Sequence, residues 1–397
     1  MEIDEYLEKL IKDGSSITQD KLKKIKEEVL LNIKRNDINK SIANILSDIE
    51  ESTYNYINSN TIKGISSTIY LQDKSNYYLN ISCGKSIHNE FINAYTEFDI
   101  ASITKLFTLF LVFRYEELGL INLNNKICDI NLDFKYLDYT VLDIMKMAGN
   151  IITNSRIDHV SNKNDAMNIL KTVHPVNYDL NVNHYTDIGF MVLGKIIESI
   201  SGEAYKSSLE KFLLEYNIQI NSDMNIAGNG HIDFKPHDPK ARIFDSVIGS
   251  AGVFINSINM TRFAKSIFDQ KIISKKNLDK LSTHFFKLYH DNRGYAGINL
   301  KHPLGIKKSA TPNEYSRLSF SHQGFTGSSV IFDPINKIHN SIFVDAIDLN
   351  AKAKHQEFFK YYNLYHEELV INSLKLYLIK KYYDKYEKAN IKILKTI

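Results

Sequence analysis

The chain has 397 residues, of which 43% are apolar and 24% are charged, a composition typical of a globular protein with one large domain or two ordinary ones. The formal net charge of +3 is too small for this length to indicate nucleic-acid binding, and the basic residues interleaved with aromatic ones are confined to the C-terminal tail. We therefore expect a small-molecule or peptide substrate.

Three features of the sequence indicate where in the cell the protein is located. The first residues, MEIDEYLEKL, are acidic where a signal peptide would be basic. The longest nearly continuous apolar run, from Leu106 to Phe113, is far shorter than the ~20 residues of a membrane span. Cys83 and Cys128 provide neither a disulfide framework nor a metal-ligand spacing. These features predict a cytoplasmic protein with no metal and no cofactor.

Apolar residues recur at helical spacing in two N-terminal segments and alternate in the next two, which predicts two helices followed by a β-hairpin. These elements are expected at residues 17–35, 38–57, 67–71 and 77–82. A buried helix should follow from about Ala101 to Gly119, because the run after Lys105 is apolar on nearly every side. Later helices are expected at residues 140–147, 190–200, 259–268 and 274–286.

The second half of the chain returns to alternation. Residues 221–254 lack periodicity over most of their length, which predicts a long functional loop. Short strands are expected at residues 297–300, 317–322, 328–333 and 339–345. Strands at both ends and helices in the middle predict an α+β fold, in which an antiparallel sheet built from both ends of the chain is flanked by helices and carries an inserted, mainly helical subdomain.

Three regions are predicted from these patterns. They are an N-terminal helical extension at residues 1–50, a main domain at 51–360 with a helical insertion at about 115–235, and a basic helical tail at 361–397. Residues 374–397 contain seven lysines and two acidic residues, so the tail could bind a membrane surface or a protein partner. We favour the alternative, in which its Tyr, Leu and Ile side chains pack on the domain.

The chemistry indicated by the sequence centres on Ser102 and Lys105. A serine hydroxyl needs a base within hydrogen-bond reach to act as a nucleophile, and positions i and i+3 of a helix lie on one face. Burial and nearby positive charge would lower the pKa of Lys105 and free its amine to accept a proton. The same S-x-x-K pattern begins at Ser82 and at Ser208, but the copy at Ser102 opens a long buried helix.

Two more polar motifs follow in order, Tyr185-Thr186-Asp187 and His322-Gln323-Gly324. Together with Ser102-x-x-Lys105 they resemble the serine β-lactamase and penicillin-binding protein superfamily, in particular its class C-like esterase and D-alanyl-D-alanine carboxypeptidase branch. The flanking segments HQGFTGSSVIFDP and HDPKARIFDSVIGSAGVF resemble that branch too. The resemblance covers roughly residues 57–348 and departs at Gln323 and Thr186, where threonine and serine are usual.

The resemblance implies a β-lactamase/transpeptidase-like fold and a serine hydrolase that reacts through an acyl-enzyme. Ser102 would be the nucleophile and Lys105 its base, and Tyr185 would share the proton transfer because a phenol becomes a usable base beside positive charge. Asp187 would hold Lys105 and a substrate amide. Taken singly, Tyr185 could merely pack against a helix end, and Asp187 could cap the following helix.

The third motif would bind substrate and transition state. His322 would contribute a hydrogen bond or charge, Gly324 would lie beside it, and the N–H groups of Ser102 and Phe325 would form the oxyanion hole. Taken singly, His322 could be an ordinary strand histidine. His237 and Asp238 could line the site or tie their loop, and they are left outside the catalytic set.

Three functions remain open from the sequence. The first is a serine hydrolase acting on an ester or a small amide or peptide. The second is a cytoplasmic acyltransferase or peptide-tailoring enzyme of a biosynthetic pathway, which the missing export signal favours. The third is a catalytically silent binding protein of the same fold, for which the replacement at Gln323 is the one hint in the site.

Overall fold

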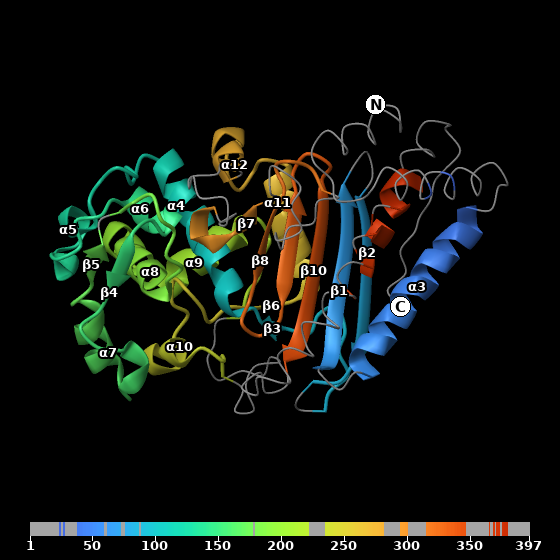
Figure 1. Ribbon diagram of the computed structural model, residues 1–397, viewed down its shortest axis with the longest axis horizontal. Helices are drawn as coiled ribbons and strands as arrows, with labels where there is room; N and C mark the ends of the chain where they lie inside the picture. The colour runs from blue at the N-terminus through green and yellow to red at the C-terminus, as the bar shows by residue number, and fades with distance from the viewer. Residues whose placement is uncertain are drawn as a thin grey trace. The chain divides into compact units, whose positions relative to one another are not determined.

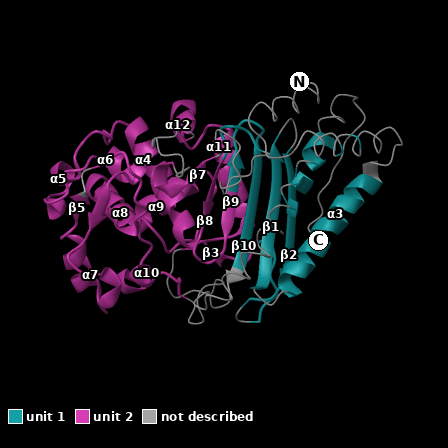
Figure 2. Ribbon diagram, in the orientation of Figure 1, with its two compact units in different colours: residues 1–94, 301–319, 331–397 teal, residues 95–300, 320–330 magenta. Residues whose placement is uncertain are grey.

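A computed structural model describes residues 38–58, 62–72, 76–86, 89–177, 179–221, 235–281, 294–300 and 315–346, together with residues 24, 27, 365, 368, 369, 371–373 and 375–379. The chain divides into two compact units, which Figure 2 shows in different colours. The first comprises residues 1–94, 301–319 and 331–397, and the second comprises 95–300 and 320–330. The regions predicted with boundaries at residues 50 and 360 remain predictions, and the helix predicted at 17–35 falls almost entirely outside the described residues.

The first unit is built on antiparallel strands taken from both ends of the chain. β1 (Ile62–Gln72) forms a hairpin with β2 (Asn76–Gly84) and pairs on its other edge with β10 (Ile338–Ala346), as Figure 1 shows. The register places Ser67 opposite Ile81 on one side and opposite Ile342 on the other. The predicted hairpin and the predicted sheet from both ends of the chain are confirmed.

The core of the first unit lies between these strands and helical segments near the two ends of the chain. α3 (Ile38–Asn58) confirms the helix predicted at 38–57, and its buried isoleucines at helical spacing belong to the same cluster as the strand residues. Tyr365 stacks on Tyr56 with ring centroids 5.4 Å apart, and its hydroxyl donates to Ser67 Oγ at 2.8 Å. The predicted tail enters this core through Tyr377, Leu378 and Ile379, whereas residues 380–397 lie outside the described part of the chain.

The second unit is mainly helical. Its helices are α4 (Thr104–Glu117), α5 (Ile127–Ile130), α6 (Val141–Lys146), α7 (Lys163–Leu170), α8 (Asp187–Ser201), α9 (Tyr205–Leu214), α10 (Pro239–Phe244), α11 (Ser257–Phe268) and α12 (Lys275–Leu281). Its short strands form the antiparallel pairs β3 (Phe98–Asp99) with β6 (Phe254–Ile255), β4 (Asn150–Ile152) with β5 (His174–Asn177), and β7 (Asn299–Leu300) with β8 (Phe320–Gln323). β9 (Ser329–Asp333) contains the boundary between the units.

Helix α4 is buried along its first ten residues, as its apolar composition predicts. Phe107 and Phe110 meet Phe263 of α11 edge-on, with ring centroids 4.7 and 5.1 Å apart. On another side, Thr108 Oγ1 donates to the Gly249 carbonyl at 2.6 Å and lies 2.5 Å from the Tyr205 hydroxyl. Packing on several sides fixes the helix that carries Lys105. None of the described helices is both long enough and apolar enough to cross a membrane.

Helix α10 was not predicted, because it lies in the segment expected to be a loop. Asp238 caps it, since its Oδ1 accepts the N–H groups of Lys240 and Ala241 at 2.8 and 3.0 Å, and Pro239 occupies the first helical position. Six residues are too few for hydrophobic periodicity to show. The Asp-Pro pair is the local signal that could have predicted this helix.

Candidate active site

Ser102 lies in a 3₁₀ turn, Ala101–Ile103, that runs directly into α4. The turn follows β3, which β6 holds in place through the pairs Phe98 with Ile255 and Asp99 with Phe254. Ala101 has a positive φ of 44°, a conformation that L side chains adopt at a cost, and the carboxylate of Asp99 accepts its N–H at 2.8 Å. The backbone before Ser102 is therefore held in a strained turn by a buried neighbour.

The amine of Lys105 meets the hydroxyl of Ser102, as the i, i+3 spacing predicts. Lys105 Nζ is 2.9 Å from Ser102 Oγ, 2.7 Å from Asp187 Oδ1 and 3.3 Å from the Ser250 carbonyl oxygen. The Lys105 side chain is completely buried, while Ser102 is partly exposed. A nucleophile and an amine are thus in hydrogen-bond contact at a position that solvent reaches.

The charge state of Lys105 differs from the sequence-based expectation. Burial alone would lower its pKa, but the charge and hydrogen bonding of Asp187 and Tyr185 outweigh burial and raise the pKa above its ordinary value. The pKa was expected from desolvation and positive neighbours alone, although the resemblance already implied that Asp187 would hold Lys105, and the structure places that carboxylate in direct contact with the amine. Lys105 is therefore an ammonium ion at neutral pH.

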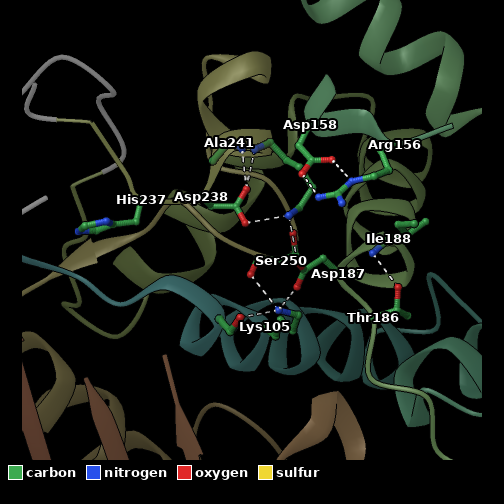
Figure 3. A network of polar contacts seen from close by, with 12 residues as sticks. Lys105, Arg156, Asp158, Thr186, Asp187, Ile188, His237, Asp238, Ala241 and Ser250 are labelled. Carbon is green, nitrogen blue, oxygen red and sulfur yellow. Dashed lines mark hydrogen bonds and ion pairs between the residues drawn. The ribbon is translucent and has the colours of Figure 1, made fainter. Parts of the chain in front are cut away.

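The second motif supplies the groups that surround this ammonium. Tyr185 is 41% exposed, and Lys105 Nζ lies 4.9 Å from the centroid of its ring. Thr186 caps α8 by accepting the Ile188 N–H at 3.1 Å, so the helix begins at Asp187, three residues earlier than predicted. Asp187 is consequently the first helical residue and not the cap, and its side chain turns toward Lys105, as Figure 3 shows.

A second lysine, which sequence reasoning missed, contacts the same carboxylate. Lys240 Nζ lies 3.1 Å from Asp187 Oδ2 and 3.1 Å from Asp238 Oδ2, so ammonium and carboxylate groups alternate from Lys105 to Asp238 (Figure 3). Burial opposes the ionisation of Asp187, but the two ammonium groups hold the pKa of its carboxyl well below the usual range. Asp238, which the sequence left undecided, is part of this network, while the His237 side chain points away from it.

The turn after β8 lies against the segment that leads into Ser102. Thr326 Oγ1 donates to the Asp99 carbonyl at 2.8 Å, and a Cβ added to Gly324 would come within 2.5 Å of the Ile100 carbonyl oxygen. Among the main-chain hydrogen bonds that the described residues make outside their helices and strands, none is donated by the N–H of Ser102 or of Phe325. An oxyanion hole requires two such donors, and this role for the N–H groups of Ser102 and Phe325 remains a prediction.

His322 is nearly inaccessible, at 2% exposed. Its Nδ1 lies 3.0 Å from the Gln323 carbonyl oxygen and its Nε2 lies 3.2 Å from the Ala296 carbonyl oxygen. The next residue, Gly297, lies against the Tyr185 ring, because a Cβ there would come within 2.5 Å of it. The Ala296-Gly297 segment thus links the second and third motifs, and contact of His322 with substrate remains a prediction.

The two other S-x-x-K copies are engaged differently. Ser82, in β2, hydrogen-bonds with Ser66 and Asn80, and the ammonium of Lys85 lies 4.8 Å from the centroid of the Phe91 ring. Ser208, in α9, contacts Ser201 at 3.1 Å, while its Lys211 pairs with Glu203. Of the three copies, all of which are described, the one at Ser102 joins amine and hydroxyl. The copy at Ser102 opens a long buried helix, as expected, and its catalytic role remains a prediction.

The chain is similar to known proteins in sequence and in fold. The family described as Beta-lactamase matches residues 58–346, whereas no curated protein sequence matches the chain. Among solved structures, the octameric penicillin-binding protein homologue from Pyrococcus abyssi has a TM-score of 0.55 and 18% identity, covering 76% of this chain and 73% of that one. A class C β-lactamase has a TM-score of 0.62 and 16% identity over 81% and 96% of the two chains.

A third structure, of EstCE1, is described as a hydrolase with promiscuous acyltransferase activity. It has a TM-score of 0.62 and 11% identity, covering 81% of this chain and 99% of that one. Identities this low show a shared fold and nothing about a shared substrate. The family match spans most of the chain and includes all three motifs, and the chain therefore belongs to the Beta-lactamase family.

Proposed function

We propose that this protein is a serine hydrolase that forms an acyl-enzyme on Ser102 from an ester or a small amide or peptide. The observation that carries the proposal is the contact of 2.9 Å between Ser102 Oγ and Lys105 Nζ at the entrance of a buried helix. A partly exposed hydroxyl held by a buried amine fits the requirements of an activated nucleophile.

In the proposed first step, Ser102 Oγ attacks the substrate carbonyl and its proton leaves toward Lys105 or Tyr185. The new oxyanion would accept hydrogen bonds from the N–H groups of Ser102 and Phe325, and removing one such donor typically costs about 10²–10³ in turnover. The bond to the leaving alcohol or amine breaks, and the leaving group takes the proton. In the second step water hydrolyses the ester on Ser102 and releases the acid.

Because Lys105 carries a proton at neutral pH, it can act as a base only in the fraction of molecules that have lost that proton. The proposal therefore includes an acylation rate that rises with pH above neutrality. Tyr185, whose ring lies 4.9 Å from the ammonium, is the second group placed to carry the proton.

Covalent labelling tests the proposal. A fluorophosphonate probe or a fluorescent penicillin should attach to each chain once, at Ser102, and intact mass should show one adduct per chain. Ser102→Ala should abolish this adduct. Lys105→Ala should nearly abolish it, and a cooperative thermal unfolding transition at a lower temperature should show that the variant still folds. Ser208→Ala is the matched control, because Ser208 begins another S-x-x-K copy and should label like wild type. Labelling that persists in Ser102→Ala would overturn the assignment.

A second candidate is acyl transfer, in which an amine or alcohol replaces water in the second step. The structural similarity to EstCE1, which is described as having promiscuous acyltransferase activity, favours testing it. Turnover of a p-nitrophenyl ester with and without an added amine separates the two reactions, because transfer yields an amide product at the expense of acid. A binding protein would give neither turnover nor a covalent adduct.

A further inference from the structure

Lys240 holds a position that the reaction proposed above does not yet use. It is the second residue of α10, where Asp238 caps the helix, and its side chain is 17% exposed. Burial would lower its pKa, but Asp187 and Asp238 raise the pKa above its ordinary value, so the side chain stays charged. Lys240 thus places a largely buried positive charge on the same carboxylate, that of Asp187, which Lys105 contacts.

The two lysines divide the oxygens of Asp187 between them. Oδ1 is 2.7 Å from Lys105 Nζ, and Oδ2 is 3.1 Å from Lys240 Nζ. A carboxylate with a single ammonium partner raises the pKa of that partner by the full effect of its negative charge. A second ammonium on the other oxygen offsets part of that charge and adds repulsion toward the first. Lys240 therefore opposes the effect of Asp187 on Lys105.

Other charged groups face this cluster from neighbouring elements. Tyr185 adjoins Lys105, and Asp158, which is paired with Arg156 in the 3₁₀ turn Ile157–His159, is close enough to Lys240 for its pKa to be lowered by it. The pKa of the buried Asp99 is raised by the charge of Asp238 and lowered by that of Arg242. A substitution at residue 240 leaves all these residues in place, but it removes the charge that Lys240 presents to Asp158 and Asp238.

We infer that Lys240 is a positioning residue for acylation, because by holding the second oxygen of Asp187 it limits how tightly that carboxylate keeps the proton on Lys105. The inference rests on the proposed function. Without Lys240, the charge of Asp187 would act on Lys105 alone and raise its pKa further. Fewer molecules would then carry Lys105 as a free amine at any given pH. Ser102 would then lose its proton less readily, although Ser102, Lys105 and Tyr185 are all unchanged.

The test is the rate of Ser102 labelling by a fluorophosphonate between pH 7 and pH 10. In Lys240→Met, the pH at which labelling reaches a set rate should rise by about 1 unit, the shift expected from one neighbouring charge. Lys240→Gln also removes the charge but can still hydrogen-bond, and it should shift the profile in the same direction. Lys240→Arg should restore the wild-type profile. Lys195→Met, which breaks the 2.7 Å contact with Glu198 elsewhere on α8, should leave the profile unchanged.

A double-mutant cycle separates action through Asp187 from general damage to the fold. In an Asp187→Asn background, Lys240→Gln should move the profile less than it does in wild type, because only the direct repulsion between the two ammonium groups remains once the shared carboxylate is gone. Equal shifts in both backgrounds would overturn the inference. An unmoved profile in both Lys240→Met and Lys240→Gln, with wild type labelling normally, would overturn it as well. Wild type that does not label at Ser102 at all would overturn the proposed function and this inference with it.

Discussion

The carboxylate of Asp99 accepts the main-chain N–H of His237 at 2.8 Å across 138 residues of sequence. Its other oxygen accepts the N–H of Ala101, the residue of positive φ that precedes Ser102. Asp99 is 1% exposed. One buried side chain therefore ties the turn of Ser102 to the segment that leads through Asp238 into α10, which carries Lys240.

Replacing this carboxylate should loosen both segments. An asparagine has one acceptor oxygen and would turn its NH₂ group toward one of the two N–H donors, so Asp99→Asn should lower the free energy of unfolding by about 1–3 kcal/mol. It should also slow labelling of Ser102. Urea denaturation and labelling rates measure the two effects. Asp133→Asn, which removes an exposed pair with Lys171, is the control and should cost less than about 1 kcal/mol. Equal effects of the two changes would contradict the role given to Asp99.

The titration of Asp99 should appear in the pH dependence of stability. Burial raises the pKa of Asp99 from its ordinary 3.8 to about 6, although two N–H groups oppose the rise. The folded state therefore binds a proton where the unfolded chain has released it. The resulting stabilisation is complete below pH 4 and is lost as the pH rises through 6, and two pH units correspond to about 3 kcal/mol. Unfolding free energies measured from pH 4 to pH 7 should fall more steeply in wild type than in Asp99→Asn. Parallel curves would show that Asp99 does not titrate in this range.

Gly324 should tolerate no larger residue. A Cβ there would lie 2.5 Å from the Ile100 carbonyl oxygen, so Gly324→Ala must push the turn after β8 away from the turn of Ser102. We expect a loss of about 1–3 kcal/mol in stability and a fall in labelling of at least tenfold, because the Phe325 N–H moves with that turn. Gly119→Ala is the control, since it has a positive φ but open space around it and should reduce stability without slowing the labelling. A wild-type labelling rate in Gly324→Ala would argue against Phe325 as an oxyanion donor.

Asp187→Asn should act on Lys105 in the direction opposite to Lys240→Met. Removing the carboxylate removes the main cause of the raised pKa of Lys105, so the labelling profile should move to lower pH by about 1 unit or more. Stability should fall by about 3–5 kcal/mol, because two nearly buried ammonium groups lose their shared partner. Labelling rates and urea denaturation of the same sample test both statements. A profile that moves to higher pH would refute this account of Lys105.

The sequence predicted the sheet, the buried helix and the meeting of Ser102 with Lys105, because alternation and helical spacing are local patterns. It did not predict that Lys105 would be held as an ammonium ion. The resemblance implied that Asp187 would hold Lys105, but no local pattern shows how close the two charges lie, which is 2.7 Å. Lys240 was missed for a similar reason. Its own helix is short, and its partner Asp187 comes from a helix that begins 52 residues earlier in the chain.

The pairing of β1 with β10 restricts when the first unit can be completed on the ribosome. β10 begins at Ile338, so most of the chain must emerge before β1 acquires its second neighbour. Until then Ile65 and Ile69, which the finished protein buries, lack the part of their core that β10 and the C-terminal helical residues supply. A nascent chain of this protein therefore carries an apolar strand through most of its synthesis, and such a strand is the kind of surface that chaperones bind.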